Sequence, residues 1–306
     1  MEQKSMTALI AAFSRVYHAE FDEPKVFYDP IARQLMTDDE YRQIMGYMTG
    51  GIDFFAPEKK SELTDPKEIL KWVVQTQLAP TPLARARYCE DMVMNAINID
   101  AKQYVILGAG MDTFAYRNPE ILSNIHVFEV DHPETQKFKR MKVEQAGWVV
   151  PGNLHYVPVD FTKDDLAAEL LNCGFDAAKI AFFSWPGVTY YLEKKDIENM
   201  VKTISSISPY GSGLLFDYPD EKFLTSDVKR VQNQIAMAKA AGEPMKPGFC
   251  YEELEQLLAE YGFLIYEHLT TEDIESLFFA NRSDDLHAFE NTNFALAVKK
   301  INGDVK

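Results

Sequence analysis

Gln103 to Arg117 reads Gln-Tyr-Val-Ile-Leu-Gly-Ala-Gly-Met-Asp-Thr-Phe-Ala-Tyr-Arg, and this stretch decides the fold class. Its apolar start, Tyr104 to Leu107, is typical of a buried parallel strand, and the glycines that follow indicate a tight turn. Glycine permits unusual backbone dihedrals and lets a ligand lie against the backbone, because it has no β-carbon. The turn Gly108-Ala109-Gly110 is therefore a candidate cofactor-binding loop.

Two cofactor classes use such a loop, and the residues after it help to separate them. A dinucleotide fold has a third glycine in G-x-G-x-x-G for close helix packing, and the pyrophosphate binds at the helix N-terminus. Here the third position is Thr113, and the neighbouring carboxylate of Asp112 would repel a diphosphate. The loop favours a nucleoside cofactor without a pyrophosphate, such as S-adenosylmethionine. Taken alone, it would fit an ordinary strand-to-helix turn about as well.

The next two predicted strands end in acids. Residues 125–131 place Glu129 and Asp131 on one face, about 20 residues after the loop, where an acid that binds ribose hydroxyls is expected. Either could bind a ribose diol, and we favour Asp131 because it lies just beyond the strand. Residues 154–159 are followed by Asp160-Phe161, a carboxylate for an adenine amino group beside an apolar side chain for its ring.

A fourth strand is predicted at residues 179–185. In an open α/β sheet the carboxyl ends of the strands line the crevice that holds the ligand. Ser184 and Trp185, at the end of this strand, are candidates for contact with the cofactor, and Thr189 in the segment that follows is a candidate for contact with the acceptor.

The motifs Val-Ile-Leu-Gly-Ala-Gly-Met-Asp-Thr, Val-Phe-Glu-Val-Asp-His-Pro and Val-Pro-Val-Asp-Phe, in this order and spacing, resemble the leucine carboxyl methyltransferase family. The likeness is to its bacterial branch, which includes polyketide O-methyltransferases, and it extends to Val26 to Ala32 and Ala84 to Asp91. The resemblance implies a class I methyltransferase fold, a Rossmann-like, doubly wound, mostly parallel sheet of seven strands, and S-adenosyl-L-methionine as cofactor. The alternation of predicted strands and helices also indicates a doubly wound α/β sheet.

In the resembled family an arginine binds the carboxylate of the methionine part of the cofactor. Arg85 matches this position by register and Arg87 is the reserve; being two residues apart, they point to different faces of a helix. Surface pairing with Glu90 and Asp91 is the alternative. The chain departs from the family where many members have Glu-Gly, because it has Pro186-Gly187.

Residues 1–80 are expected to form an N-terminal helical cap, and residues 81–306 the cofactor-binding domain. Residues 7–18 carry apolar side chains at helical spacing and predict an amphipathic helix, whose usual role is to pack on a core. In the resembled family this segment is part of a lid over the cofactor. Arg15, Tyr17 and His18 are therefore candidates to face the substrate, and His18 could act as a general base.

The remaining elements follow from the same patterns. Asp29 and Pro30 suit the N-cap and first residue of a helix. Further helices are predicted at residues 61–79, 82–99, 162–173, 194–207, 225–241, 251–261 and 272–282, and further strands at 213–218, 263–268 and 293–299.

Composition excludes several functional classes. With 31 basic and 47 acidic residues, the net charge of −16 would repel nucleic acid and anionic membranes. The three cysteines lack C-x-x-C spacing and the six histidines lack H-x-x-H spacing, so neither a disulfide framework nor a metal site is expected. No apolar run is long enough to cross a membrane, and the first residues lack a signal-peptide pattern. We expect a cytoplasmic protein without a membrane or nucleic-acid partner.

The function predicted from these features is methyl transfer from S-adenosyl-L-methionine to an oxygen of a small molecule. The acceptor could be an organic acid, which is already ionised, or a hydroxylated, polyketide-like compound, for which a base would help. The alternatives are a nucleotide-dependent Rossmann oxidoreductase and a cofactor-binding homologue without turnover.

Overall fold

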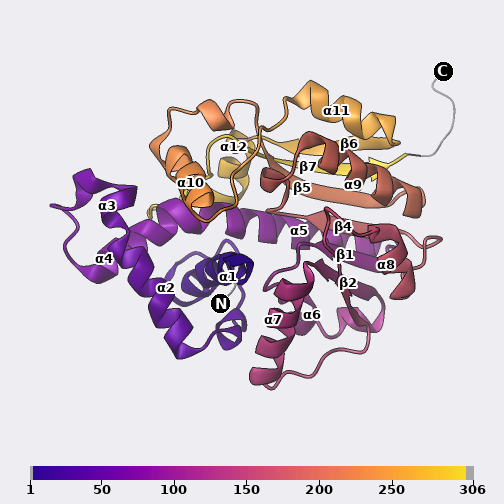
Figure 1. The fold of residues 1–306 in the computed structure, drawn as a ribbon, viewed down its shortest axis with the longest axis horizontal. Coiled ribbons are helices and arrows are strands. Elements are labelled where there is room, and N and C mark those ends of the chain that lie inside the picture. Colours follow the sequence, from indigo (N-terminus) through magenta and orange to yellow (C-terminus); the bar gives the residue numbers. More distant parts are fainter. Residues whose placement is uncertain (1–2, 301–306) are drawn as a thin grey trace.

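The computed structural model describes residues 3–300, with side chains from residue 6 onward. These residues form one seven-stranded sheet in the order β3-β2-β1-β4-β5-β7-β6, in which β7 is antiparallel to both of its neighbours. The predicted seven-stranded, mostly parallel α/β sheet is therefore confirmed (Figure 1). The strands are β1 Gln103–Leu107, β2 His126–Asp131, β3 Leu154–Pro158, β4 Ala181–Trp185, β5 Gly213–Pro219, β6 Phe263–Leu269 and β7 Thr292–Lys299.

Helices precede, connect and cover the strands. Those that lie before the sheet are α1 Gln3–Phe21, α2 Asp38–Gly50, α3 Ile52–Phe55, α4 Pro66–Val73 and α5 Pro80–Asn98. Those that follow β1 are α6 Phe114–Arg117, α7 Pro133–Gln145, α8 Leu166–Asn172, α9 Lys194–Ile207, α10 Lys229–Ala240, α11 Tyr251–Glu260 and α12 Thr271–Ile274.

The two faces of the sheet bury two separate apolar cores. Tyr104 and Ile106 belong to the core beneath α1 and α5, whereas Val105 and Leu107 belong to the core beneath α8, α9 and α11. This alternation follows from the period of two in a strand, and a strand buried on both faces is apolar throughout. Helices on both faces make the sheet doubly wound, as predicted.

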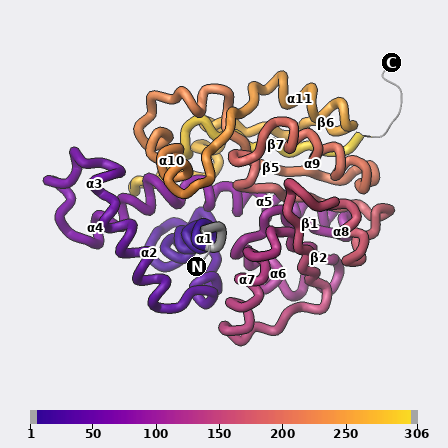
Figure 2. The backbone as a smooth tube through the Cα atoms, viewed as in Figure 1, coloured from indigo at the N-terminus to yellow at the C-terminus, as the bar shows by residue number. Residues whose placement is uncertain are grey.

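The N-terminal helices gather beside the sheet. Figure 1 shows α1 to α4 together on one side, and the tube in Figure 2 shows α1 beside α2 and α7. The division into a cap of residues 1–80 and a domain of residues 81–306 stays a prediction, and its outer bounds lie outside the described residues.

Several predicted helices have different limits. The helix predicted at 61–79 is α4, which begins at Pro66 and is followed by a π-helical turn, Val74–Leu78. Hydrogen bonding explains two other differences. Asp29 Oδ1 accepts from the N–H of Ala32 at the start of a 3₁₀ turn, Ala32–Leu35, whose N-cap is Ile31, where an α-helix with Asp29 as N-cap was predicted. The helix predicted from residue 162 begins at Leu166, because Asp165 caps it while Asp160 holds residues 161–163 in a turn. The helix predicted at 225–241 is α10, and the one at 272–282 divides into α12 and a π-helical turn, Glu275–Phe279.

Candidate functional site

The loop after β1 is fixed against the end of β2. The N–H groups of Gly108 and Ala109 both donate to the carbonyl of Val130, and the N–H of Gly110 donates to Asp131 Oδ2 at 2.5 Å. Gly108 and Gly110 have φ values of 75° and 50°, which favour glycine. A β-carbon on Gly108 would lie 2.5 Å from Val188 Cγ2. Glycine at these two positions thus leaves the backbone of the turn open to the adjoining space.

A cavity of about 330 Å³ lies at the carboxyl ends of β1 to β4. Parallel strands in an α/β sheet end at one edge, which explains why segments distant in the sequence meet there. Nine of the residues predicted to form the site line this cavity: Arg15, Arg85, Gly108, Ala109, Gly110, Asp131, Asp160, Phe161 and Ser184.

Two carboxylates of this cavity are oriented by the backbone and by neighbouring side chains. Asp131 accepts from the N–H groups of Gly110 and His132, and its burial raises its pKa. Asp160 accepts from Lys163 and from Thr162, and these contacts lower its pKa. Asp160 Oδ1 accepts both the N–H and the hydroxyl of Thr162, whereas Asp160 Oδ2 and both oxygens of Asp131 each still have a lone pair to accept a further hydrogen bond.

Arg85 lies at the opposite wall of the cavity, against the turn after β4. A β-carbon on Gly187 would be 2.4 Å from Arg85 Nη1, so the guanidinium lies directly over this glycine, whose φ is 73°. Arg85 Nη1 is 3.5 Å from Asp217 Oδ2. By contrast, Arg87 is half exposed and pairs with Asp91 at 2.7 Å. The two arginines thus face different ways, and Arg85 is the one at the cavity.

Asp217, at the end of β5, organises this wall and was not predicted. It is fully buried, and its Oδ1 accepts from the N–H of Gly187 at 2.6 Å. Its Oδ2 accepts from the hydroxyl of Tyr190 at 3.2 Å. The signal for it was an acid within the otherwise apolar strand Gly213–Pro219, since a buried acid needs partners.

Three predicted contact residues lie elsewhere. Trp185 follows Ser184 in β4 and so points to the opposite face, into the core beneath α9. Glu129 is two residues before the end of β2, where α7 covers it and Lys139 Nζ lies 2.5 Å from it. The hydroxyl of Thr189 is buried and donates to the carbonyl of Asp217. Proposed roles for these three in direct ligand contact do not fit these positions.

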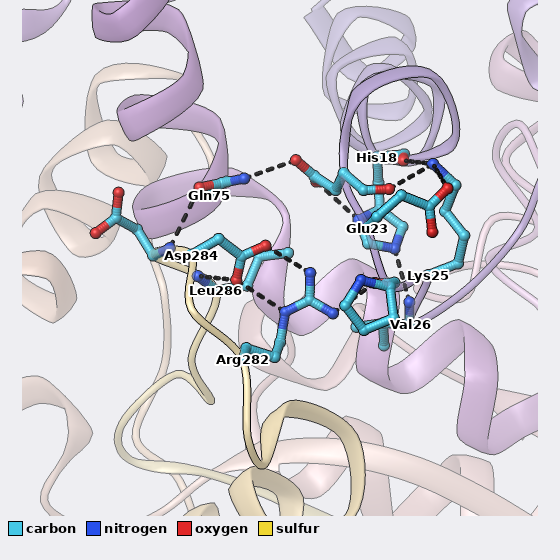
Figure 3. Close-up of polar contacts among 11 residues, drawn as sticks. His18, Glu23, Lys25, Val26, Gln75, Arg282, Asp284 and Leu286 are labelled. Carbon is cyan, nitrogen blue, oxygen red and sulfur yellow. Dashed lines mark hydrogen bonds and ion pairs between the residues drawn. The ribbon is translucent and has the colours of Figure 1, made fainter.

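His18 and Tyr17 face the interior of the cap. His18 Nε2 accepts from the N–H of Val26 and Nδ1 contacts Asp22 at 2.8 Å, so Nδ1 carries the proton (Figure 3). Both ring nitrogens are thereby occupied, and the fully buried ring cannot serve as a base at the cavity. Tyr17 packs on Phe21, and burial raises its pKa to about 12.

The histidine belongs to a polar network that joins α1 and the segment after it to residues 282–286. Asp22 Oδ1 accepts from Gln75 Nε2 at 2.6 Å, and the side chain of Arg282 donates to the carbonyl of Pro24 and pairs with Asp284 (Figure 3). These are structural contacts that hold α1 in place.

Arg15, unlike the other two residues predicted on α1, reaches the cavity. Its Nη2 donates to the carbonyl of Met111 at 2.6 Å, and its Nε lies 3.1 Å from Asp29 Oδ2. The same buried carboxylate accepts from the hydroxyl of Thr113. Asp29 therefore links α1 to the loop after β1, which explains why the third position of the glycine motif is a threonine.

A second cavity, of about 220 Å³, adjoins the first and shares seven lining residues with it. The shared residues include Arg85, Gly187, Tyr191 and Glu243. Glu243 follows α10 in a loop with no periodic pattern, so no sequence signal indicated it. Gln77 and Gln234, which also line the second cavity, lie in predicted helices, but neither belongs to a spaced motif that would indicate a site.

The described part of the chain lacks a metal cluster and a membrane-spanning helix. No group of three or more His, Cys, Asp or Glu side chains within residues 3–300 could hold a metal ion. Across the same residues, no helix has the length and apolar character needed to cross a membrane.

The residues at the first cavity fit an adenosyl cofactor. Two glycines leave the backbone bare, two acids can accept hydrogen bonds, and the acidic lining suits a sulfonium cation. This site, together with the strand order 3-2-1-4-5-7-6, defines a class I methyltransferase that depends on S-adenosyl-L-methionine.

Comparison with known protein families supports this class. Residues 8–205 match the model of the leucine carboxyl methyltransferase family, and the chain belongs to this family. It is 48% identical over 301 residues to YktD of Bacillus subtilis (strain 168), provisionally described as an S-adenosyl-L-methionine-dependent methyltransferase; the match covers 97% of this chain and 99% of YktD.

A more distant relative has the same description, and a solved structure has the same fold. A Mycobacterium ulcerans (strain Agy99) protein with the same provisional description is 28% identical over 243 residues, which are 79% of this chain and 74% of that protein. Among solved structures, a DUF574 family protein from Streptomyces avermitilis has the same fold, with a TM-score of 0.54 and 14% identity over 94% of this chain and 97% of the other.

Proposed function

We propose that this protein transfers the methyl group of S-adenosyl-L-methionine to an oxygen of a small molecule. The observation that carries the proposal is the pair of adjoining cavities, of about 330 and 220 Å³, with a common wall at Arg85 and Gly187. The first has the acids and bare backbone that suit the cofactor. The second has the volume of a small organic molecule.

The residues of the first cavity have separate roles in this proposal. Asp131 accepts hydrogen bonds from the ribose diol, Asp160 from the adenine amino group, and Phe161 packs on the adenine ring. Gly108 and Gly110 allow close approach of the backbone. Arg85 binds the methionine carboxylate, a role supported by its position at the shared wall.

Bound cofactor supplies an electrophilic methyl group, and the protein aligns the acceptor with it and excludes water. Helix α1 provides the lid: Thr7, Ala11 and Arg15 line the first cavity, and Arg15 is fixed by Met111 and Asp29. Because Arg15 donates to the carbonyl of Met111, α1 is held against the loop that we assign to the cofactor.

Transfer of a radioactive methyl group tests the proposal. The protein is incubated with methyl-labelled S-adenosyl-L-methionine and the small-molecule fraction of a bacterial extract, and label is expected in an organic-soluble product. Mild alkali then separates methyl esters, which release labelled methanol, from methyl ethers, which do not. Incorporation only into protein, or no incorporation together with tight binding of NAD, would refute the proposed function.

A further inference from the structure

We propose that the second cavity holds the methyl acceptor, that this acceptor is an uncharged, mostly apolar molecule with hydroxyl groups, and that Glu243 receives the proton of the reacting hydroxyl. The inference rests on the proposed function and narrows it from oxygen acceptors in general to hydroxyl groups. Three observations support it: two unpartnered polar atoms, the balance of charge, and the position of Glu243.

The wall of the second cavity is mostly apolar, with two buried polar atoms that have no partner. It lies between α1, α5, α10 and the loop after α10, and its apolar side chains include Ile10, Leu78 and Met237. Thr81 Oγ1 and Gln234 Oε1 are buried, and neither has a hydrogen-bond partner within residues 3–300. Both residues line this cavity.

Buried polar groups are normally hydrogen-bonded, so two unpartnered oxygens in one cavity call for an explanation. A ligand with hydroxyl groups supplies one, because an O–H donates to the amide oxygen of Gln234 or to the hydroxyl of Thr81. An acceptor without donors would leave the amide oxygen desolvated and unpaired. The cavity therefore fits a hydroxylated ligand better than a hydrocarbon.

The charged groups at the second cavity argue against an anionic ligand. Of its described lining residues, Arg85 and Glu243 carry the charge. Arg85 is already beside Asp217 and lies over Gly187. A carboxylate in the second cavity would meet Glu243 with no free cation to balance it.

The N-terminus of α5 does not supply the positive charge that an anionic ligand would need. Pro80 and Pro82 have no backbone N–H, and the N–H of Leu83 is donated to the carbonyl of Ala79 at 3.0 Å. A helix start with several free N–H groups would attract an anion, but three of the first four residues of α5 offer none.

Glu243 is the carboxylate that lines both cavities, where the donor methyl group and the acceptor oxygen must meet. One of its oxygens accepts from the hydroxyl of Thr7 at 3.2 Å, which holds it against α1. In the proposed step the sulfur–methyl bond breaks and an oxygen–methyl bond forms. The hydroxyl proton passes to the Glu243 carboxylate and then to water, so charge and atoms balance.

The binding test uses a matched pair of ring compounds with the product S-adenosyl-L-homocysteine present. We expect calorimetry to detect binding of 2,6-dihydroxynaphthalene and no binding of 6-hydroxy-2-naphthoic acid. Gln234→Leu should weaken binding of the diol roughly tenfold. The control Gln232→Leu, at an exposed position of the same helix, should leave it unchanged. Glu243→Gln should allow the acid to bind.

The turnover test examines the proton acceptor. The wild-type protein should convert the diol to 6-methoxy-2-naphthol, and Glu243→Gln should lower the rate roughly a hundredfold without weakening diol binding. Glu243→Asp should restore part of the rate. Equal binding of diol and acid, no diol binding, or an unchanged rate in Glu243→Gln would overturn the inference. If S-adenosyl-L-homocysteine still binds in those cases, the cofactor site survives and only the acceptor assignment fails.

Discussion

The two cavities are built from different parts of the fold. The first lies at the ends of β1 to β4, where backbone hydrogen bonds fix each residue, as Val130 and Asp131 fix the loop after β1. The second is enclosed by helices α1, α5 and α10 and a loop. The comparison separates a site fixed by the edge of the sheet, which we propose for the cofactor, from a site enclosed by helices and a loop, which we propose for the acceptor.

The largest expected effect is at the wall that both cavities share. Gly187→Ala should lower cofactor affinity roughly a hundredfold. The new methyl group would lie 2.4 Å from Arg85 Nη1 and would therefore displace the guanidinium that we propose binds the cofactor's carboxylate. Gly147→Ala is the matched control: its φ is 70°, similar to that of Gly187, but no atom lies within 4 Å of the added carbon. Calorimetry of S-adenosyl-L-homocysteine measures both. Equal losses in the two variants would contradict the role given to Arg85.

A substitution at the sheet edge should weaken binding in the first cavity and leave binding in the second unchanged. Asp131→Asn should lower cofactor affinity roughly thirtyfold, because hydrogen bonds to a charged acceptor are lost. Binding of 2,6-dihydroxynaphthalene, measured by ligand-detected NMR without cofactor, should stay the same. Weakening of diol binding to the same extent would mean that the two cavities are one site.

Breaking the link between α1 and the loop after β1 should have a smaller effect on cofactor binding. Asp29→Asn should lower cofactor affinity about fivefold, since Arg15 and Thr113 lose their common partner. It should also reduce the free energy of unfolding by about 3 kcal/mol, because Asp29 is only 1% exposed. Urea denaturation measures this, with the exposed Asp39→Asn as control. A variant as stable as the wild type would show that Asp29 does not hold the cap.

No change in cofactor affinity is expected from Glu129→Gln, but the pH dependence of stability should change. Burial raises the pKa of Glu129 from 4.5 to about 7. Between these values the folded protein binds more protons than the unfolded chain, so this group's contribution to stability falls as pH rises, by up to about 3 kcal/mol. The free energy of unfolding of Glu129→Gln relative to that of the wild type should therefore rise between pH 4.5 and 7. A difference that stays constant or falls over this range would contradict the assignment.

The sheet edge could be predicted from the sequence because each of its signals is local. Strand endings at Gly108, Asp131 and Asp160 follow from short apolar runs, and parallel strands place such endings at one edge. The wrong predictions, Trp185 and Glu129, lie one and two positions along their strands from Ser184 and Asp131, which line the cavity. Trp185 points to the other face because side chains alternate, and Glu129 lies under α7, where it pairs with Lys139.

The second cavity could not be predicted, because its residues meet only through tertiary packing. Gln77, Thr81, Gln234 and Glu243 come from three helical regions and a loop, and none belongs to a spaced motif. For His18 the error was to predict a site role for a residue that is structural. A histidine on an amphipathic helix suggested a base, but the backbone N–H of Val26 occupies its free nitrogen.

The central claim is that the ends of β1 to β4 hold the adenosyl part of S-adenosyl-L-methionine. Isothermal titration of the wild-type protein with S-adenosyl-L-homocysteine and with NAD tests it most directly. We predict one site for S-adenosyl-L-homocysteine, occupied with a stoichiometry of about one, and no heat from NAD. Tight binding of NAD, with none of S-adenosyl-L-homocysteine, would contradict the claim.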